Sequence, residues 1–244
     1  MIPKIIHYCW FGKNPLPHDV KKCIESWKKY CPEYEIKCWT EENYDIQKNQ
    51  FLLEAYKNRA WAFVSDYARL DIIYTNGGIY LDTDVELIKS LDFLLNEQCY
   101  LGIQQKDNYI NTGLGFGAEK DNKVIGILLS AYDELVFDKS ILNQLSCPIL
   151  NTESLEKFGY IKENKYQTIL NASIFPSIYF DPYASGTSQS LMCDKTVSIH
   201  HYSASWTKSS QRFKRKLVRI IGTKNINKIK NILRKDDKIE ENPK

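Results

Sequence analysis

The stretch SDYARLDIIYTNGGIYLDTDVEL, from Ser65 to Leu87, decides the fold class of this 244-residue chain. Its first half carries apolar residues at helical spacing, and the helix is predicted to end at the glycine pair that begins with Gly77. The short apolar run IYL that follows indicates a buried strand. That strand leads into Asp82 and Asp84, and two like charges side by side are costly unless a cation lies between them. The stretch therefore predicts a helix, a strand and a cation site in direct succession.

The segments on both sides of this stretch alternate between strand and helix patterns. Strands are predicted at residues 4–12, 34–40, 79–82, 99–104 and 112–118, and helices at residues 15–32, 62–76 and 123–137. The first three elements run strand, helix, strand, an order that favours parallel pairing in an α/β sheet. Asp19 is the predicted N-cap of the first helix. Residues 138–196 are less regular, and strand-to-loop patterns are visible only near 173–183 and 196–206.

The composition is that of a globular protein that can bury a sizeable core. Hydrophobic residues make up 43% of the chain and charged residues 26%. The seven cysteines are scattered and form no C-x-x-C pair, which argues against a disulfide framework or a zinc knuckle and favours a reducing compartment. No apolar run reaches the roughly 18 residues of a membrane span. A soluble or peripheral protein is therefore expected.

Positive charge gathers towards the C-terminus. Residues 207–235 contain 11 Lys and Arg and no acidic residue, so the preceding chain is net acidic. Aliphatic residues recur there at helical spacing, with Gly222 between two short predicted helices. Such a basic amphipathic pattern is typical of binding to an anionic membrane surface, although a solvated arm packed on the body would look the same. Few aromatics are interleaved with the cations, so no nucleic-acid partner is expected.

The Asp82-Thr83-Asp84 motif suits a hard divalent cation. If the backbone stays extended, side chains two residues apart point to the same side, which would bring both carboxylates together. Mg²⁺ and Mn²⁺ prefer oxygen ligands and often bridge to phosphates, and open α/β sheets bind ligands at the carboxyl ends of their strands. The competing interpretation is a surface turn with two solvated acids, because a D-x-D triplet is common by chance.

Ser65, Asp66 and Arg69 form a second polar group, on the helix before the motif. Asp66 and Arg69 are three residues apart, and as a surface ion pair they would contribute only about 0.3–0.5 kcal/mol. The surrounding helix is mostly apolar, however, and a buried charged pair is costly unless it serves a site. In a site, Asp66 would accept hydrogen bonds from sugar hydroxyls and Arg69 would neutralise a diphosphate.

Other polar and aromatic positions suit a ligand site. Trp10 ends the first predicted strand and can stack on a base, although packing is the commoner use of a core tryptophan. Asn111 precedes a strand with glycines at 113, 115 and 117, which allow backbone or ligand to approach closely. His200 and His201 follow a strand pattern. Since adjacent residues on a strand face opposite ways, at most one of them is expected to enter a metal site.

These segments, in this order, resemble glycosyltransferase family 32. The resemblance is carried by IPKIIHYCWFG at residues 2–12, the pair Ser26-Trp27, SDYARLDIIYTNGGIYLDTDV at residues 65–85 and HHYSASW at residues 200–206. It spans nearly the whole body, while residues 120–190 match little. The family includes fungal mannosyltransferases, bacterial capsule and lipopolysaccharide enzymes and, more remotely, glucosylating toxins.

The resemblance implies a GT-A fold, that is, a single Rossmann-like mixed sheet flanked by helices, over residues 1–206, with residues 207–244 as a basic helical tail. It also implies Mn²⁺ or Mg²⁺ at the D-x-D motif. The implied metal ligands are Asp82, Asp84 as the more direct ligand, and His201. The catalytic residues would be Asp66, Arg69, Asp82 and Asp84. The donor-binding residues would be Trp10, Ser65, Asp66, Arg69, Tyr80, Asp82, Asn111, Ser205 and Trp206, with Trp10 on the nucleobase and the last two closing over the β-phosphate.

We therefore expect a metal-dependent, retaining hexosyltransferase of surface-polysaccharide synthesis. The donor would be a nucleotide-sugar, with a UDP-sugar favoured over GDP-mannose, and the acceptor a saccharide or a lipid-linked oligosaccharide. The expected location is cytoplasmic, peripheral on the inner face of the cell membrane. Two alternatives stay open: a metal-dependent phosphohydrolase of nucleotide-sugars, although the sequence around Asp82 offers no ligands for a second metal, and a non-catalytic sugar- or lipid-binding protein.

Overall fold

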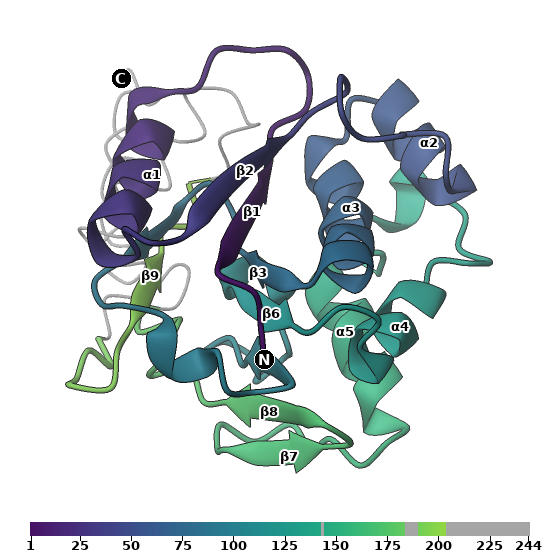
Figure 1. The fold of residues 1–244 in the computed structure, drawn as a ribbon. Helices are drawn as coiled ribbons and strands as arrows, with labels where there is room; N and C mark the ends of the chain where they lie inside the picture. Colours follow the sequence, from purple (N-terminus) through teal and green to yellow (C-terminus); the bar gives the residue numbers. More distant parts are fainter. Residues whose placement is uncertain (143, 184–189, 204–244) are drawn as a thin grey trace, which may run out of the picture.

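The computed structural model describes residues 1–142, 144–183 and 190–203 (Figure 1). Its strands are β1 (Ile5–Cys9), β2 (Glu35–Trp39), β3 (Gly78–Tyr80), β4 (Val85–Leu87), β5 (Cys99–Gly102), β6 (Phe116–Ala118), β7 (Gln167–Ile169), β8 (Ala172–Phe175) and β9 (Ser198–His200). Its α-helices are α1 (His18–Tyr30), α2 (Gln50–Lys57), α3 (Trp61–Asn76), α4 (Lys123–Ser130) and α5 (Cys147–Glu156). Short 3-10 turns are η1 (Asp92–Leu94), η2 (Thr112–Leu114) and η3 (Lys139–Ile141).

The main sheet is mixed, which confirms the predicted fold class. Its seven strands follow the order β2-β1-β3-β6-β5-β8-β7. β1 pairs in parallel with β2 and β3, and β5 with β8, while the β3–β6, β6–β5 and β8–β7 pairs are antiparallel. β4 and β9 leave this sheet and form an antiparallel pair of their own. A second small sheet, which the sequence did not predict, therefore lies beside the main one.

Two hydrophobic clusters cover the two faces of the sheet. α2, α3, α4 and α5 pack on one face, and α1 packs on the other together with β4 (Figure 1). The strand period of two divides the side chains between them. Ile6 and Ile79 face the α1 cluster, whereas Cys9 and Tyr80 face the α3 cluster. The central strands are thus buried on both sides.

Local signals placed several of these elements correctly. α3 ends at Asn76, and Gly77 follows with φ 69°, as expected for a glycine C-cap. The N-cap of α1 is Pro17, and the predicted cap Asp19 lies instead in the first helical turn. The helix predicted to reach residue 137 ends at Ser130. The apolar pattern beyond that point comes from side chains that enter the core from irregular backbone.

One predicted strand, at residues 112–118, is only half a strand. Its first part is the turn η2, because the side chain of Asn111 accepts a hydrogen bond from the N–H of Gly113 and caps it. β6 then begins at Phe116. The region without a regular pattern contains α5 and β7, which the sequence analysis did not assign, and β8, which overlaps the strand-to-loop pattern predicted near 173–183.

The pair Ser26-Trp27 has a structural explanation. The indole N–H of Trp27 donates to the carbonyl oxygen of Val85 at 2.7 Å, and the N–H of Leu87 donates to Oγ of Ser26 at 2.9 Å. Both contacts join α1 to β4. They hold the segment that directly follows Asp84.

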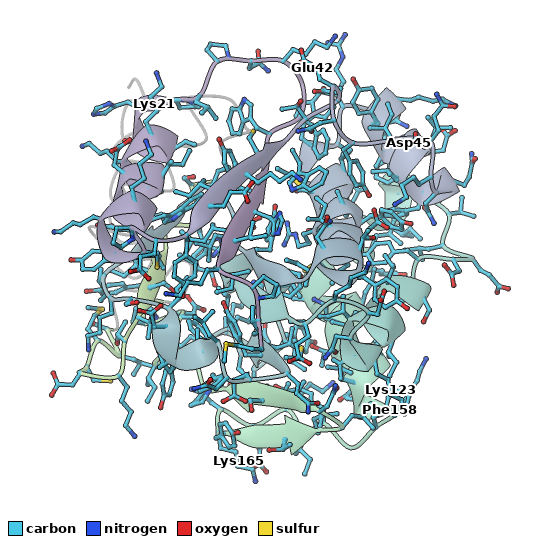
Figure 2. All side chains as sticks on the ribbon, viewed as in Figure 1. Lys21, Glu42, Asp45, Lys123, Phe158 and Lys165 are labelled. Atoms are coloured by element: carbon cyan, nitrogen blue, oxygen red, sulfur yellow. The ribbon has the colours of Figure 1, made fainter. Side chains whose placement is uncertain are left out.

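The surface is polar, as Figure 2 illustrates. Side chains such as Lys21, Glu42 and Lys165 are exposed and project outward. Within the part of the chain that the structure describes, no helix combines the length and apolar character that crossing a membrane requires. The predicted boundary after residue 206 and the basic tail lie outside the described residues.

Candidate functional site

Asp82 and Asp84 lie in a turn and not in an extended strand. β3 ends at Tyr80, and the N–H of Val85 donates to the carbonyl oxygen of Asp82 at 3.0 Å. The strand argument for placing both carboxylates on one side was therefore wrong in its mechanism. The carboxylates nevertheless converge, because the turn folds the chain where β4 leaves the main sheet.

Asp82, Asp84 and His200 form a group whose donor atoms suit a divalent cation. One carboxylate oxygen from each aspartate and one ring nitrogen of His200 all lie within 4.8 Å of one another. Two carboxylate oxygens and one imidazole nitrogen suit Mn²⁺ well and Mg²⁺ less well. Their side chains are between 9% and 18% exposed, so a ligand can still reach the group. We call these three residues the DDH cluster.

His200, and not His201, belongs to this cluster, which corrects the prediction of His201 as a metal ligand. Nε2 of His200 lies 3.1 Å from Oδ1 of Asp84, whereas Nε2 of His201 lies 2.8 Å from Oε2 of Glu86. The physical reason is the register of the small sheet. His200 pairs with Val85, next to Asp84, and the following side chain then points the other way.

Asp84 is held as a carboxylate by hydrogen bonds as well as by His200. The N–H and Oγ of Ser203 donate to its Oδ2 at 2.7 and 3.0 Å. Burial alone would raise the pKa of Asp84, but the ion pair with His200 and the Ser203 hydrogen bonds outweigh it and leave the pKa below its usual value. Burial likewise opposes the charged form of His200, and the Asp84 carboxylate more than offsets this and raises the pKa of the imidazole.

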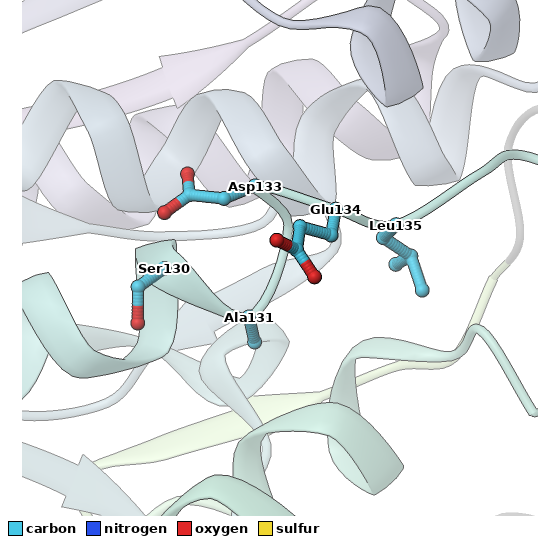
Figure 3. Close-up of a pocket in the computed structure, with 5 residues that line it drawn as sticks. All are labelled: Ser130, Ala131, Asp133, Glu134 and Leu135. Carbon is cyan, nitrogen blue, oxygen red and sulfur yellow. The ribbon is translucent and has the colours of Figure 1, made fainter.

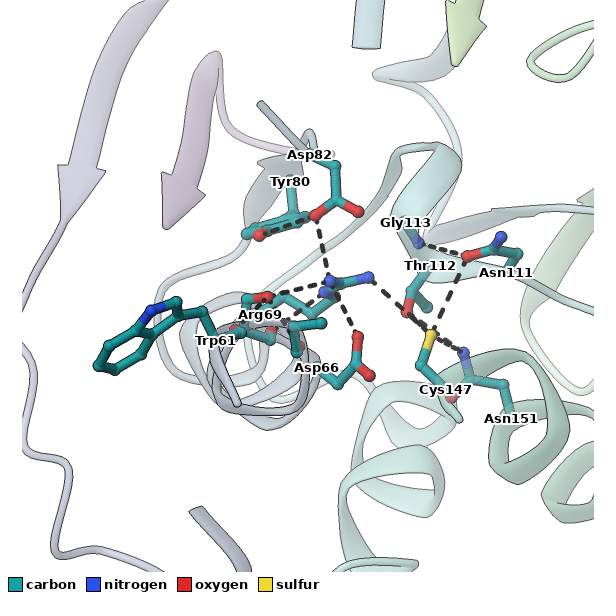
Figure 4. A network of polar contacts seen from close by, with 12 residues as sticks. Trp61, Asp66, Arg69, Tyr80, Asp82, Asn111, Thr112, Gly113, Cys147 and Asn151 are labelled. Carbon is teal, nitrogen blue, oxygen red and sulfur yellow. Dashed lines mark hydrogen bonds and ion pairs between the residues drawn. The ribbon is translucent and has the colours of Figure 1, made fainter. Parts of the chain in front are cut away.

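Arg69 occupies the centre of a second polar network, drawn in Figure 4. Its Nη2 lies 2.9 Å from Oδ1 of Asp66 and 3.1 Å from Oδ1 of Asp82. The arginine side chain is only 4% exposed, so the pair with Asp66 is not a surface ion pair. Tyr80 adds a hydrogen bond from its hydroxyl to the same oxygen of Asp82, at 3.1 Å. Asp66, Arg69, Tyr80 and Asp82 form what we call the Arg69 network.

The guanidinium of Arg69 is already engaged by neighbouring side chains and backbone. Its guanidinium faces two carboxylates, and its Nε donates to the carbonyl oxygen of Ser65 at 3.1 Å. Burial raises the pKa of Asp66 to about 6, against the opposing charge of Arg69 and a hydrogen bond from the backbone N–H of Cys147. Arg69 thus orients carboxylates, while its predicted contact with a diphosphate stays a prediction.

Three other predicted donor-binding residues lie within the described part of the chain and make local contacts. Oγ of Ser65 bonds back to the carbonyl oxygen of Ala62 within α3, at 2.8 Å. The indole N–H of Trp10, just after β1, donates to the carbonyl oxygen of Asn14 at 2.6 Å. Asn111 is buried and caps η2. Ser205 and Trp206 lie outside the described residues.

Gly113 is a site residue whose importance the glycine spacing only hinted at. A Cβ atom at this position would lie 2.7 Å from Oδ2 of Asp82 and 3.2 Å from Nη1 of Arg69. The first distance is shorter than a Cβ contact normally reaches, so an added side chain would displace the Asp82 carboxylate. The glycine therefore allows η2 to pack against the carboxylate in its present position.

Residues of α5 complete the wall behind Asp66, and nothing in the sequence pattern pointed to them. Sγ of Cys147 lies 3.0 Å from Oγ1 of Thr112, and Nδ2 of Asn151 donates to the same Oγ1 at 3.2 Å. Figure 4 shows both α5 side chains pointing towards the Arg69 network, while the ring of Trp61 points away from it. The burial of Cys147 raises its pKa to about 12, so the thiol is protonated at neutral pH.

A surface hollow lies elsewhere, at the end of α4 (Figure 3). It is lined by Ser130, Ala131, Asp133, Glu134 and Leu135. No member of the DDH cluster or of the Arg69 network lines it. A single short segment forms this hollow, and it therefore takes no part in the site described here.

Comparison with known proteins identifies the region that carries the site. Residues 17–101 match the family described as "Glycosyltransferase sugar-binding region containing DXD motif". This region is similar to the sugar-binding region of glycosyltransferases with a DXD motif. It contains the complete Arg69 network and both aspartates of the DDH cluster, which confirms the resemblance found in the sequence.

Two curated relatives that match part of this chain are a glycosyltransferase and a mannosyltransferase. An uncharacterized glycosyltransferase of Acanthamoeba polyphaga mimivirus is 34% identical over 125 residues, which are 47% of this chain and 50% of the relative. The inositol phosphoceramide mannosyltransferase 3 of Schizosaccharomyces pombe is 32% identical over 123 residues, which are 47% of this chain and 33% of the relative. The chain thus spans half or less of the length of these two relatives.

Solved structures support the same fold. The structure described as "PaToxG Glycosyltransferase" superimposes with a TM-score of 0.51 at 17% identity, covering 64% of this chain and 68% of that chain. This likeness shows the fold alone, and that fold is the predicted GT-A fold.

Proposed function

We propose that this protein is a metal-dependent, retaining glycosyltransferase that moves a hexose from a nucleotide-sugar to a saccharide acceptor. The observation that carries the proposal is the DDH cluster next to the buried Arg69 network, with Asp82 common to both. A UDP-sugar is the favoured donor. Divalent-metal sites of this donor set suit a diphosphate, whose oxygens complete the coordination.

In this mechanism the chain's own residues hold the charges in place. Asp84, His200 and Asp82 would be the ligands of Mn²⁺ or Mg²⁺. A cation bound there supplies electrostatic stabilisation of the leaving nucleoside diphosphate as the glycosidic bond breaks. Arg69 and Tyr80 keep the Asp82 carboxylate oriented, and Gly113 leaves room for its second oxygen.

Retention of configuration is proposed without a covalent glycosyl-enzyme. The carboxylates of the site are already engaged: Asp66 and Asp82 with Arg69, and Asp84 with His200. A nucleophile of a retaining glycosidase needs a free carboxylate facing the sugar. We therefore favour front-side transfer through an oxocarbenium-like transition state, with Asp66 as hydrogen-bond acceptor for the donor sugar.

The direct test is donor turnover by the purified full-length chain. Nucleotide release from a panel of UDP- and GDP-sugars would be measured with Mn²⁺, with and without saccharide acceptors. We expect release that depends on both metal and acceptor, with the glycoside as product. Acceptor-independent formation of sugar phosphate would instead identify a phosphohydrolase, and binding without turnover a non-catalytic protein.

The biological setting is a second part of this proposal. We place the enzyme in surface-polysaccharide synthesis, such as that of capsule, O-antigen or exopolysaccharide, on the inner face of the cell membrane. A saccharide or lipid-linked oligosaccharide would be its acceptor. The support is the basic amphipathic pattern of residues 207–235, since each lysine or arginine near an anionic surface contributes about 1 kcal/mol.

Vesicle co-sedimentation tests this location. The full-length chain should sediment with anionic vesicles at low salt, and 0.5 M salt should weaken this on the order of tenfold or more because screening shortens the range of the attraction. The triple substitution K214E/R215E/K216E should abolish sedimentation. Its matched control carries K21E/K22E/K123E, three exposed lysines of the body. Equal loss in both variants would refute a specific role of the tail.

A further inference from the structure

Asp181 is a buried carboxylate that the proposed mechanism does not use. It is 0% exposed, and its Oδ2 accepts hydrogen bonds from the N–H of Gln105 and from the hydroxyl of Tyr202, each at 2.8 Å. Its other oxygen, Oδ1, has no hydrogen-bond partner among the described residues. A buried polar atom left without a partner costs about 1–3 kcal/mol, so a carboxylate in this position needs an explanation.

His200 also has a ring nitrogen, Nδ1, that lacks a hydrogen-bond partner among the described residues. Its Nε2 faces Asp84, whereas its Nδ1 is buried and has no partner within the described part of the chain. Tyr202 joins this imidazole to Asp181. The ring centroid of Tyr202 lies 4.1 Å from that of His200, and its hydroxyl reaches the Asp181 carboxylate.

We propose that Asp181 is the positioning residue that holds His200 in the tautomer able to bind a divalent cation. The two atoms make no direct hydrogen bond in the structure, and one water molecule between them would accept from Nδ1–H of His200 and donate to Oδ1 of Asp181. This inference rests on the proposed metal-dependent function and concerns a residue outside the cluster that would contact the cation.

The chemistry of imidazole gives the reason. A cation at Nε2 needs the lone pair of that nitrogen, so the single proton of the neutral ring must lie on Nδ1. Binding of the cation therefore displaces any proton from Nε2 to solvent, and Nδ1–H requires an acceptor. A carboxylate behind a metal-bound histidine fixes both the tautomer and the ring orientation. Asp181 is the buried carboxylate with a free oxygen near this ring.

Asp181→Asn is the most informative variant. It keeps the shape of the side chain and replaces the acceptor Oδ1 with a hydrogen-bond donor. Its amide oxygen can still accept from Gln105 and Tyr202, which places the NH₂ group where Oδ1 was. That NH₂ would donate to the bridging water, which would then donate to Nδ1 and leave the ring proton on Nε2, where it blocks the cation. We expect Mn²⁺ affinity, measured by titration calorimetry on the full chain without donor, to fall about 10- to 100-fold.

Tyr202→Phe is the matched control. It keeps the ring against His200 and removes one hydrogen bond to Asp181, but on the Oδ2 side. Its Mn²⁺ affinity should change less than about threefold, because the Oδ1 contact is kept. Asp181→Asn with Mn²⁺ affinity as high as that of the wild type would overturn the inference.

A second readout keeps the inference testable even if the variant does not fold. Histidine-selective ¹⁵N labelling of the wild type, loaded with diamagnetic Zn²⁺, reports which ring nitrogen carries the proton. The expected signature is a protonated, hydrogen-bonded Nδ1 on His200, assigned by its loss in His200→Gln. An Nδ1–H that exchanges with solvent as fast as an N–H without an acceptor would overturn the inference while leaving metal binding intact. Failure of the wild type to bind Mn²⁺ at all would overturn the proposed function as well.

Discussion

The two aspartates of one D-x-D motif belong to two different regions of the molecule. Asp82 faces the α3 side, where it is paired with Arg69, and Asp84 faces the small β4–β9 sheet, where it is paired with His200. A guanidinium keeps its charge at any physiological pH, whereas an imidazole can give up its proton. Asp82 therefore has a permanent counter-charge, the Arg69 guanidinium, and a structural role. Asp84 is paired with His200, whose imidazole proton a bound cation can replace.

The largest loss of stability is expected when the permanent positive charge of Arg69 is removed. Arg69→Met would leave Asp66 and Asp82 buried without compensation, which should lower the free energy of unfolding by about 3–5 kcal/mol. Urea denaturation of the metal-free protein measures this. His200→Gln, the counterpart on the other side, should lose less than half as much. If Arg69→Met and His200→Gln lose equal free energy of unfolding, the proposed distinction between the two regions is refuted.

The next largest effect concerns turnover and not stability. Asp84→Asn keeps the shape of the side chain and removes the charge that a cation needs, so kcat/KM should fall by about 10²–10³-fold. Chelation with EDTA should stop the wild type in the same way. Circular dichroism should show an unchanged fold. If the wild type stays fully active in excess EDTA, the metal assignment fails.

Gly113→Ala should act on the Asp82 side alone. The added Cβ would lie 2.7 Å from Oδ2 of Asp82, and the crowding should cost about 1–3 kcal/mol of stability and on the order of tenfold in kcat/KM. Gly126→Ala in α4 is the matched control, since its nearest neighbour is a ring carbon of Tyr74 at 3.2 Å. It should keep its activity. A Gly113 variant as active as the control would show that Asp82 tolerates displacement.

The smallest effect is expected at Ser203. Ser203→Ala removes the hydrogen bond from Oγ to Asp84 but keeps the one from the backbone N–H, so about 1 kcal/mol is lost. Mn²⁺ affinity, measured by calorimetry, should fall by less than about tenfold, since 1.4 kcal/mol is a factor of ten. A loss as large as that of Asp84→Asn would mean that Oγ itself is a ligand and would redraw the DDH cluster.

Most of the local structure around the motif could be predicted. The helical spacing before Asn76, the glycine at 77 and the apolar run up to Leu81 are signals within a few residues, and each was confirmed. The burial of Asp66 and Arg69 was also indicated, because the helix around them is apolar. The extent of strand structure near Gly113 could not be predicted, because it depends on the side chain of Asn111, which caps η2.

The sequence alone could not predict which side chains contact one another in the site. The sequence analysis left His200 and His201 open and then favoured His201, whereas the register between β4 and β9 places His200 beside the two aspartates. It overlooked Asp181, in the loop part of the pattern near 173–183, and Cys147, in a stretch without a periodic pattern.

The sequence by itself determined the order of β1, α1, β2, α3, β3, β5, β6 and α4, the α/β class and the place of two aspartates after a buried strand. These features follow from spacing, caps and glycines, whose interactions act over a few neighbouring residues. Only the tertiary structure decided which charge each aspartate meets. Ser203 reaches Asp84 across 119 positions of sequence, and that contact exists only because β9 pairs with β4. Burial then makes each such pairing strong, since charges brought together away from water interact far more than the same charges in solvent.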